Sequence, residues 1–366
     1  MSKHKFETLD ALRGVAACAV VIRHAPTLFP GVVMEQSHLA VDLFFVLSGF
    51  VICHAYERKL ADGMNFRRFM TTPLIRLYPL YLFAALVAIG VGVVRARMGQ
   101  DEQGGVTGLL IASLVSLTMA PDPWSPMLYP LNAPTWSLAY ELLINVVYAL
   151  AFTLFRRPAF LMGLAGVASL AVLLSALREG QLDLGYSWAT AAGGLARVTL
   201  GFTLGLLTYR AHQARPHLRM DPWLALACVP LLMWISPPGV AGVLYEWSCT
   251  TAIFPILILL AAGARSPRRG APVFLALGAA SYGLYILHYP VIFAVSGAAT
   301  RILHVSGGQL PVALGVATLA TLAIGCVLID RWLDQPFRRW LSTRLLGPRG
   351  DGAAALALPA ETAMKP

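Results

Sequence analysis

Residues 38–56 read HLAVDLFFVLSGFVICHAY, and this stretch indicates which class of fold the chain adopts. A helix that crosses the hydrocarbon core of a bilayer needs about 20 mainly apolar residues. The stretch approaches that length, and Asp42 is its single acidic residue. Further segments are apolar over a comparable length, at 10–30, 74–95, 134–155, 158–177, 188–209, 245–263, 273–296 and 311–333, and a shorter one lies at 222–236. The sequence therefore predicts an all-α, polytopic transmembrane bundle of about ten spanning helices.

The composition of the whole chain agrees with this class. Of its 366 residues, 57% are hydrophobic and 13% are charged, and the mean hydropathy is +0.67. Soluble domains carry about 25% charged residues, so one soluble core would not bury this much apolar surface. The net charge of +10 comes from basic residues scattered between apolar runs, which argues against the basic face of a nucleic-acid-binding domain.

The positions of lysine and arginine predict the orientation in the membrane, because cytoplasmic loops carry an excess of both. Basic clusters follow alternate apolar segments, at Lys3, Lys5, Arg13, Arg58, Lys59, Arg67, Arg68, Arg76, Arg156, Arg157, Arg210, Arg215, Arg265, Arg268, Arg269, Arg338, Arg339 and Arg344. They share one side of the membrane if the short apolar run 106–120 does not cross. We therefore expect both termini to be cytoplasmic. We also expect one membrane domain over residues 1–345 and a disordered tail over 346–366.

Ionisable side chains inside a membrane span are costly and commonly functional. Arg13 and His24 lie eleven residues apart in the first segment, which places them on roughly the same helix face and about 16 Å apart along its axis. A topology anchor and an interfacial loop residue are the alternatives. Asp42 falls near the depth of His24, so we expect His24 or Arg23 to be its partner. A purely structural pair of Arg23 and Asp42 is the alternative.

Later segments carry further candidates at a similar depth. Trp136 and Glu141 lie one to two turns from the outer end of the fourth segment, where an interfacial tryptophan and a helix cap are the alternatives. Tyr285 and His288 are three residues apart in the outer half of the ninth segment, although a histidine beside a proline is more often structural. Arg197 lies within the sixth segment and lacks a neighbouring carboxylate, so we expect it to face a wet cavity or an anionic ligand.

Five motifs in a fixed order resemble the acyltransferase-3 family of membrane proteins: LDALRGVAACAVVIRHA, HLAVDLFFVLSGFVI, RLYPLY, TWSLAYELL and SYGLYILHYPV. The resemblance covers about residues 6–340. The family includes bacterial O-acetyltransferases that act on lipopolysaccharide, exopolysaccharide, Nod factor and macrolide sugars. The resemblance implies an enzyme of the bacterial inner membrane. It would move an acyl group, by default acetyl, from cytoplasmic acyl-CoA to a hydroxyl of a cell-envelope or exported carbohydrate, without a metal.

The resemblance also implies a catalytic residue and a donor site. Arg13 and His24 match the family's pattern of a basic residue, ten residues and a histidine, in which the histidine is regarded as catalytic. Arg76 matches the second arginine of a paired motif, whereas Thr and Pro stand at 72 and 73 in place of the first. Arg67 or Arg68 would have to replace that first arginine. Because guanidinium groups bind phosphate well, we predict Arg13, Arg68 and Arg76 as the acyl-CoA site.

The remaining candidates would assist His24, which would act as general base on the acceptor hydroxyl or accept the acyl group transiently. Glu141, which matches the family's acidic position after Trp-Ser-Leu, or Asp42 would fix the tautomer of His24. Arg197 or Tyr285 would stabilise the oxyanion. The predicted substrate-binding residues are Arg197, Trp136, Tyr285 and His288.

Two other functions would use the same buried polar residues. A transporter or flippase of a sugar-lipid or polysaccharide precursor would use them for substrate passage or proton coupling. A scaffold in a polysaccharide assembly complex would tolerate substitution at Arg13, His24 and Glu141. Transporters often carry internal repeats, and none is visible in the sequence, which favours the enzyme. Acyl-CoA hydrolysis or acceptor acylation by the purified protein discriminates between the functions.

Overall fold

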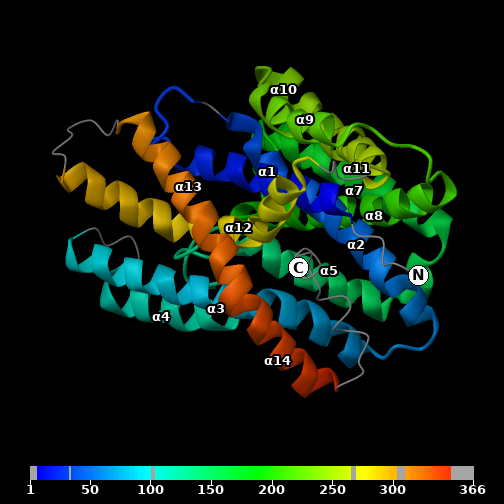
Figure 1. Ribbon diagram of the computed structural model, residues 1–366, viewed down its shortest axis with the longest axis horizontal. Helices are drawn as coiled ribbons and strands as arrows, with labels where there is room; N and C mark the ends of the chain where they lie inside the picture. Colours follow the sequence, from blue (N-terminus) through cyan, green and yellow to red (C-terminus); the bar gives the residue numbers. More distant parts are fainter. Residues whose placement is uncertain (1–5, 33, 100–103, 265–268, 303–309, 348–366) are drawn as a thin grey trace.

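The computed structural model describes residues 6–32, 34–99, 104–264, 269–302 and 310–347, and its architecture is a bundle of helices (Figure 1). No β-strand occurs within these ranges, which confirms the predicted all-α class. Most of the predicted tail, 348–366, lies outside the described residues. The helical elements are α1 (Glu7–His24), η1 (Glu35–Leu39), α2 (Ala40–Ala61), α3 (Phe66–Arg97), α4 (Gly105–Thr118), α5 (Thr135–Leu150), α6 (Phe152–Phe155), α7 (Pro158–Glu179), η2 (Trp188–Thr190), α8 (Ala191–Ala214), α9 (Pro222–Trp234), α10 (Gly239–Ser248), η3 (Cys249–Ile253), α11 (Phe254–Ala262), α12 (Ala271–Ile302), α13 (Val312–Ile329), η4 (Asp330–Asp334) and α14 (Gln335–Leu346).

Seven helical segments in the described part of the chain are long and apolar enough to cross a membrane. They are Glu35–Ala61, Phe66–Arg97, Pro158–Glu179, Trp188–Ala214, Gly239–Ala262, Ala271–Ile302 and Val312–Leu346. Three shorter apolar helices, α4, α5 and α9, accompany them. The chain is therefore a membrane protein with several transmembrane-capable helices, and the count of about ten spans stays a prediction.

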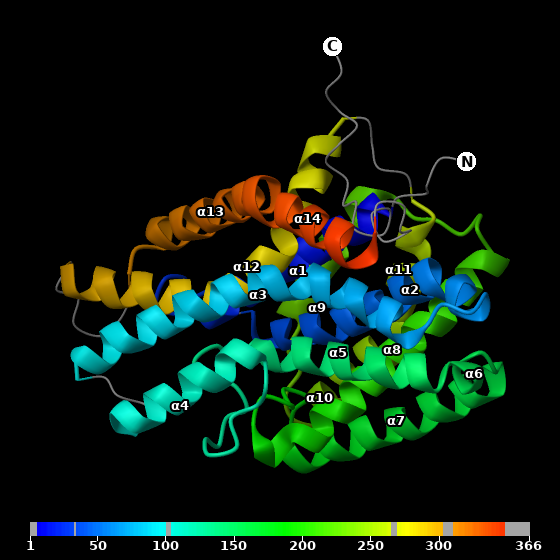
Figure 2. The same cartoon turned by 90° about the horizontal axis from the view of Figure 1, so that it is seen from below.

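Helix α4 corresponds to the short run that we expected not to cross. Its 14 residues extend for about 21 Å, which is less than the thickness of the hydrocarbon core. It ends at Met119, whose φ of +59° is left-handed. Helix α4 lies beside α3 (Figures 1 and 2), and the hydroxyl of Tyr78 near the middle of α3 donates to the Leu117 carbonyl at 2.7 Å.

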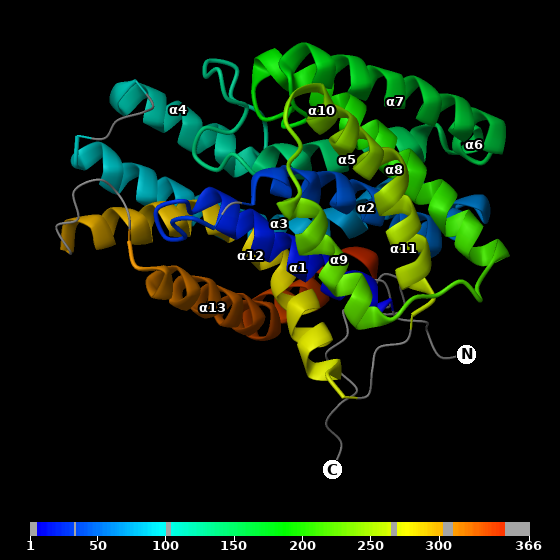
Figure 3. The ribbon, with the colours of Figure 1, turned by 90° about the horizontal axis from the view of Figure 1, so that it is seen from above.

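Helix α1 lies in the middle of the bundle and packs along α12, between α7 on one side and α13 on the other (Figure 3). The two helices approach closely because glycine faces backbone at their crossing. A methyl group at Gly14 would collide with the Leu277 carbonyl, and one at Gly278 would press on Asp10 at 3.0 Å. The other end of α1 also lies against α12, because the ring centres of His24 and His288 are 5.0 Å apart. Arg13 and His24, both on α1, are therefore both beside α12.

Helices α2 and α8 form a second close pair of the same kind. A methyl group at Gly49 would collide with the Phe202 carbonyl, and one at Gly205 would collide with the Val46 carbonyl. Without a hydrophobic driving force between helices in lipid, small residues that permit close van der Waals packing stabilise such pairs. Residues of α2 and α8 that are more than 150 positions apart in the chain thus become neighbours.

Candidate functional site

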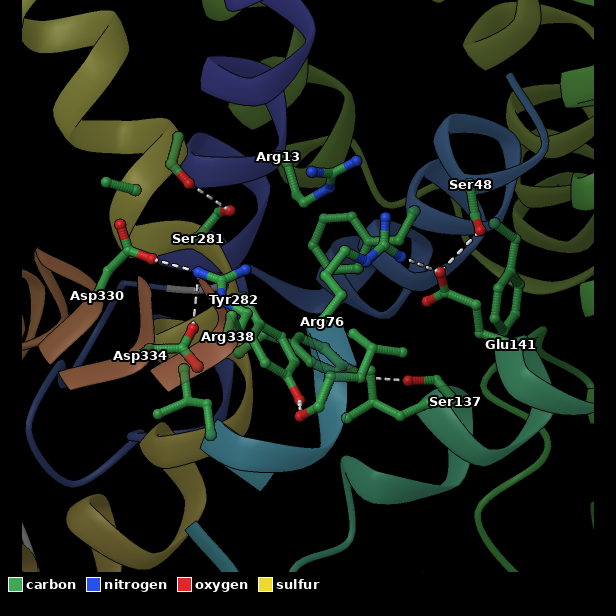
Figure 4. Close-up of a pocket in the computed structure, with 18 residues that line it drawn as sticks. Arg13, Ser48, Arg76, Ser137, Glu141, Ser281, Tyr282, Asp330, Asp334 and Arg338 are labelled. Carbon is green, nitrogen blue, oxygen red and sulfur yellow. Dashed lines mark hydrogen bonds and ion pairs between the residues drawn. The ribbon is translucent and has the colours of Figure 1, made fainter. Parts of the chain in front are cut away.

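Two cavities lie along the α1–α12 pair. The first, which we call the Arg13 cavity, has a volume of about 100 Å³ (Figure 4). Its polar lining consists of Arg13, Ser48, Arg76, Ser137, Glu141, Ser281, Tyr282, Tyr285, Asp330, Asp334 and Arg338. The second, the His24 cavity, has a volume of about 300 Å³. Its lining includes Arg23, His24, Ser37, His38, Trp136, Asp183, Tyr186, Tyr285 and Tyr289. Tyr285 lines both cavities, so a single side chain is common to the two walls.

The Arg13 cavity brings together two of the three arginines that we predicted for the donor site. Arg76 on α3 donates to Glu141 Oε1 on α5 at 2.9 Å, and Ser48 on α2 donates to the same oxygen at 2.8 Å (Figure 4). Arg13 faces the cavity from α1. Arg68 does not line it, because Arg68 lies exposed in the first turn of α3, two turns before Arg76.

A third arginine in this cavity, Arg338 on α14, was missed in the sequence as a site residue. Its Nη2 group lies 2.7 Å from Asp330 Oδ1 and 2.8 Å from Asp334 Oδ2, and all three side chains are buried. The two aspartates belong to η4, a π-helical turn between α13 and α14. The sequence contains a signal for this cluster, because Asp330, Asp334 and Arg338 are spaced four residues apart and residues at that spacing share one helix face.

The charges of the Arg13 cavity are balanced rather than strongly positive. Arg76 is paired with Glu141, Arg338 is paired with Asp330 and Asp334, and Arg13 lies 3.4 Å from Asp10. An incoming anion would therefore have to compete with these carboxylates for the guanidinium groups. Arg13 has the longest of these ion pairs, and its side chain is 24% exposed.

His24, at the end of α1, is exposed in the second cavity. Its Nδ1 atom lies 2.9 Å from the carbonyl oxygen of Val20. A carbonyl oxygen accepts hydrogen bonds and does not donate them, so this contact requires the proton to be on Nδ1. The lone pair is then on Nε2, on the side of the ring away from Val20. His24 therefore presents a basic nitrogen in the tautomer that proton abstraction needs.

The structure corrects the expected partners of Asp42 and Arg197. Asp42 contacts neither His24 nor Arg23. Instead, Arg197 Nε donates to Asp42 Oδ1 at 3.0 Å, and Arg197 Nη2 donates to Asp42 Oδ2 at 2.7 Å. Arg197 also donates to the carbonyls of Leu184 and His38.

Arg197 therefore does not face a wet cavity. Both side chains of the Arg197–Asp42 pair are 0% exposed. The physical reason is the close packing of α2 on α8, which supplies the carboxylate that the local sequence around Arg197 lacks. The carboxylates expected to hold His24 are thus engaged elsewhere, because Asp42 binds Arg197 and Glu141 belongs to the Arg13 cavity.

The other predicted substrate-binding residues surround His24. Trp136 lines the His24 cavity, and the Arg197 guanidinium lies 5.3 Å from the centre of its ring. The Tyr285 hydroxyl lies 2.7 Å from Ser137 Oγ. His288 is fully buried, its ring centre is 5.0 Å from that of His24, and its Nε2 has no hydrogen-bond partner among the described residues.

Asp183 and His38 are polar residues of the His24 cavity that we did not identify in the sequence. Asp183, between α7 and η2, accepts from Arg23 Nη2 at 2.9 Å. Burial raises the pKa of Asp183, but His38, Arg23 and Arg197 outweigh it, and the pKa lies below its ordinary value. His38 Nε2 lies 3.3 Å from Glu246 Oε1. Asp183 follows no apolar helix periodicity, so the sequence carried no signal for it.

Residues 6–331 match the family model described as an acyltransferase domain. The chain belongs to this acyltransferase family. A match that covers both α1 and α12 places Arg13, His24 and Tyr285 all inside the family domain.

Two known proteins are similar in sequence to this acyltransferase. Acyltransferase MdmB of Streptomyces mycarofaciens is 26% identical over 341 residues, which are 84% of this chain and 82% of the relative. Protein 2 in the picA locus of Rhizobium radiobacter is 41% identical over 156 residues, which are 40% of this chain and 81% of the relative. No solved structure matches the acyltransferase. In the part of the chain that the structure describes, no three His, Cys, Asp or Glu side chains form a group that could hold a metal ion.

Proposed function

We propose that this acyltransferase moves an acyl group, acetyl by default, from cytoplasmic acyl-CoA to a hydroxyl of an envelope or exported carbohydrate. In this proposal the protein lies in the bacterial inner membrane with both termini cytoplasmic. The observation that carries the proposal is the pair of cavities with Tyr285 in both walls. One cavity offers guanidinium groups, which suit a phosphate-bearing donor, and the other offers a basic imidazole.

The donor would enter at the Arg13 cavity. Coenzyme A carries several phosphates, and guanidinium groups bind phosphate oxygens through paired hydrogen bonds. Arg13 is the first contact because its present ion pair is long, and Arg76 would exchange part of its bond to Glu141 for phosphate. The thioester would then extend past Tyr285 toward His24.

His24 would act on the acceptor in the second cavity. Its Nε2 lone pair takes the proton of the acceptor hydroxyl while the oxygen attacks the thioester carbonyl carbon. The carbon–sulfur bond breaks, the CoA thiolate leaves, and the imidazolium returns its proton to the thiolate. The products are an ester and CoA thiol. Tyr285, which contacts both cavities, is placed to donate to the oxyanion of the intermediate.

A carbohydrate acceptor fits the lining of the His24 cavity. Three aromatic side chains, Trp136, Tyr186 and Tyr289, provide apolar faces, and charged side chains such as Asp183 provide hydrogen-bond partners for hydroxyls. Ligand sites in proteins commonly combine apolar and aromatic walls with a few convergent polar groups.

The proposed function is tested by two linked measurements. Mass spectrometry of surface polysaccharides compares cells that carry the gene with cells that lack it, and the purified protein is assayed for CoA thiol release from acetyl-CoA. His24→Ala should abolish both the ester and the thiol release while leaving expression and thermal stability near wild type. A protein that moves polysaccharide without consuming acyl-CoA would be the transporter instead.

A further inference from the structure

We infer that Asp183 is the carboxylate that stabilises the protonated form of His24, a role first expected of Asp42 or Glu141. The inference rests on the proposed function, in which His24 gains a proton during each turnover. Asp183 and His24 line the same cavity, and the residue next to His24, Arg23, holds Asp183 at 2.9 Å.

The backbone around Asp183 is held independently of the Asp183 side chain. The amide of Leu182 donates to Glu246 Oε2 at 2.6 Å. The carbonyl of Leu184 accepts from Arg197 Nη1 at 2.5 Å. Because the residues on both sides of Asp183 are hydrogen-bonded to buried side chains, this segment presents its carboxylate at a defined place in the cavity. A loosely held loop would not provide such positioning.

Several titratable or charged groups face His24 from the elements packed around it. Arg23 comes from α1, His38 from η1, Asp183 and Tyr186 from the segment between α7 and η2, and Tyr285, His288 and Tyr289 from α12. Asp183 is the one carboxylate among the described residues that line this cavity. When His24 accepts a proton, Asp183 therefore supplies the nearby negative charge and Arg23 supplies an opposing positive charge.

Removing Asp183 and removing Arg23 should change the protonation of His24 in opposite directions. Removing Asp183 makes the imidazolium less stable, so His24 stays neutral down to a lower pH but is a weaker base. Removing Arg23 takes away a positive charge and also frees the Asp183 carboxylate, so His24 becomes protonated at a higher pH. A pair that only clamps α1 to the neighbouring segment would give the same result whichever partner is removed.

The test compares pH–rate profiles of purified protein in nanodiscs. The assay follows CoA thiol release from acetyl-CoA in the presence of polysaccharide from cells that lack the gene. Asp183→Asn should lower the maximal rate about tenfold and move the acid limb of the profile down by about one pH unit. Arg23→Gln should move the acid limb up. Asp183→Glu should retain most of the wild-type profile.

Glu179→Gln is the matched control, because it removes one negative charge from the exposed end of α7, four residues away and outside the cavity. It should leave both the rate and the acid limb unchanged. Equal losses for Asp183→Asn and Arg23→Gln without any shift would overturn the inference in favour of a clamp. If Asp183→Asn does not fold, Arg23→Gln decides alone, because an unmoved acid limb contradicts the inference. Absence of thiol release by the wild type would instead refute the proposed function.

Discussion

The hydroxyl groups of Ser137 and Tyr285 lie 2.7 Å apart, at the place where the two cavities share a wall. Ser137 comes from α5 and Tyr285 from α12, so the contact joins two helices whose residues are 148 positions apart. Both hydroxyls also lie near the carbonyl of Pro134, at 3.1 and 3.3 Å. In the proposed reaction the thioester has to move past this pair to reach His24.

Substitution of Tyr285 should separate the polar role of the hydroxyl from the size of the side chain. Tyr285→Phe removes the hydroxyl and keeps the ring, so we expect the rate of acyl transfer to fall by about fivefold, as for the loss of roughly one hydrogen bond. Tyr285→Trp places a larger side chain between the two cavities. It should abolish acyl transfer while CoA binding persists. Both are measured by CoA thiol release and by calorimetric CoA binding. Wild-type transfer by Tyr285→Trp would show that the acyl group takes another route.

The arginines of the donor site should differ in their effect on CoA binding. Arg76→Gln removes a guanidinium from the Arg13 cavity and should weaken CoA binding at least tenfold, as expected for the loss of a charged hydrogen bond worth about 1.5–3 kcal/mol. Arg68→Gln is the matched control on the same helix. Because Arg68 is exposed and lies outside the cavity, the Arg68→Gln variant should bind CoA with wild-type affinity. Calorimetry with CoA measures both. A larger loss for Arg68→Gln would restore the site first expected from the sequence.

The buried pair of Arg197 and Asp42 should behave as a structural unit. Arg197→Met leaves the Asp42 carboxylate buried without its partner and should destabilise the protein by about 3–5 kcal/mol. The double variant with Asp42→Leu removes both charges and should regain a large part of that loss. Thermal unfolding in detergent reports the difference. If the double variant is no more stable than Arg197→Met, then the unpaired charge is not what destabilises the single variant.

The close approach of α1 to α12 should make Gly14 intolerant of even a small side chain. Gly14→Ala forces a methyl group against the Leu277 carbonyl and should cost about 1–3 kcal/mol of stability. Gly163→Ala on α7 is the control, because a methyl group there meets no neighbouring atom within 4 Å. The two melting temperatures in detergent are the comparison. Equal melting temperatures would mean that α1 moves away from α12 without penalty.

Several features of this protein could be predicted from the sequence because they depend on short stretches of chain. A run of apolar residues long enough to cross a bilayer is a helix wherever its neighbours lie, since lipid offers the backbone no hydrogen-bond partners. Segment 158–177 and helix α7 (Pro158–Glu179) agree within two residues for this reason. The relative placement of Arg13 and His24 could also be predicted, because the distance between two residues eleven positions apart on one helix does not depend on any tertiary contact.

The partners of the polar side chains were decided by the tertiary structure. Asp42 binds Arg197 across 155 positions of the chain, Arg338 enters the Arg13 cavity from α14, and Asp183 reaches the His24 cavity from a segment without apolar periodicity. Helical periodicity says which residues share a face of one helix, but it does not say which helix covers that face. That choice depends on how glycine and other small residues let all the helices pack at once, and this packing determines which charges neutralise each other and which remain in a cavity.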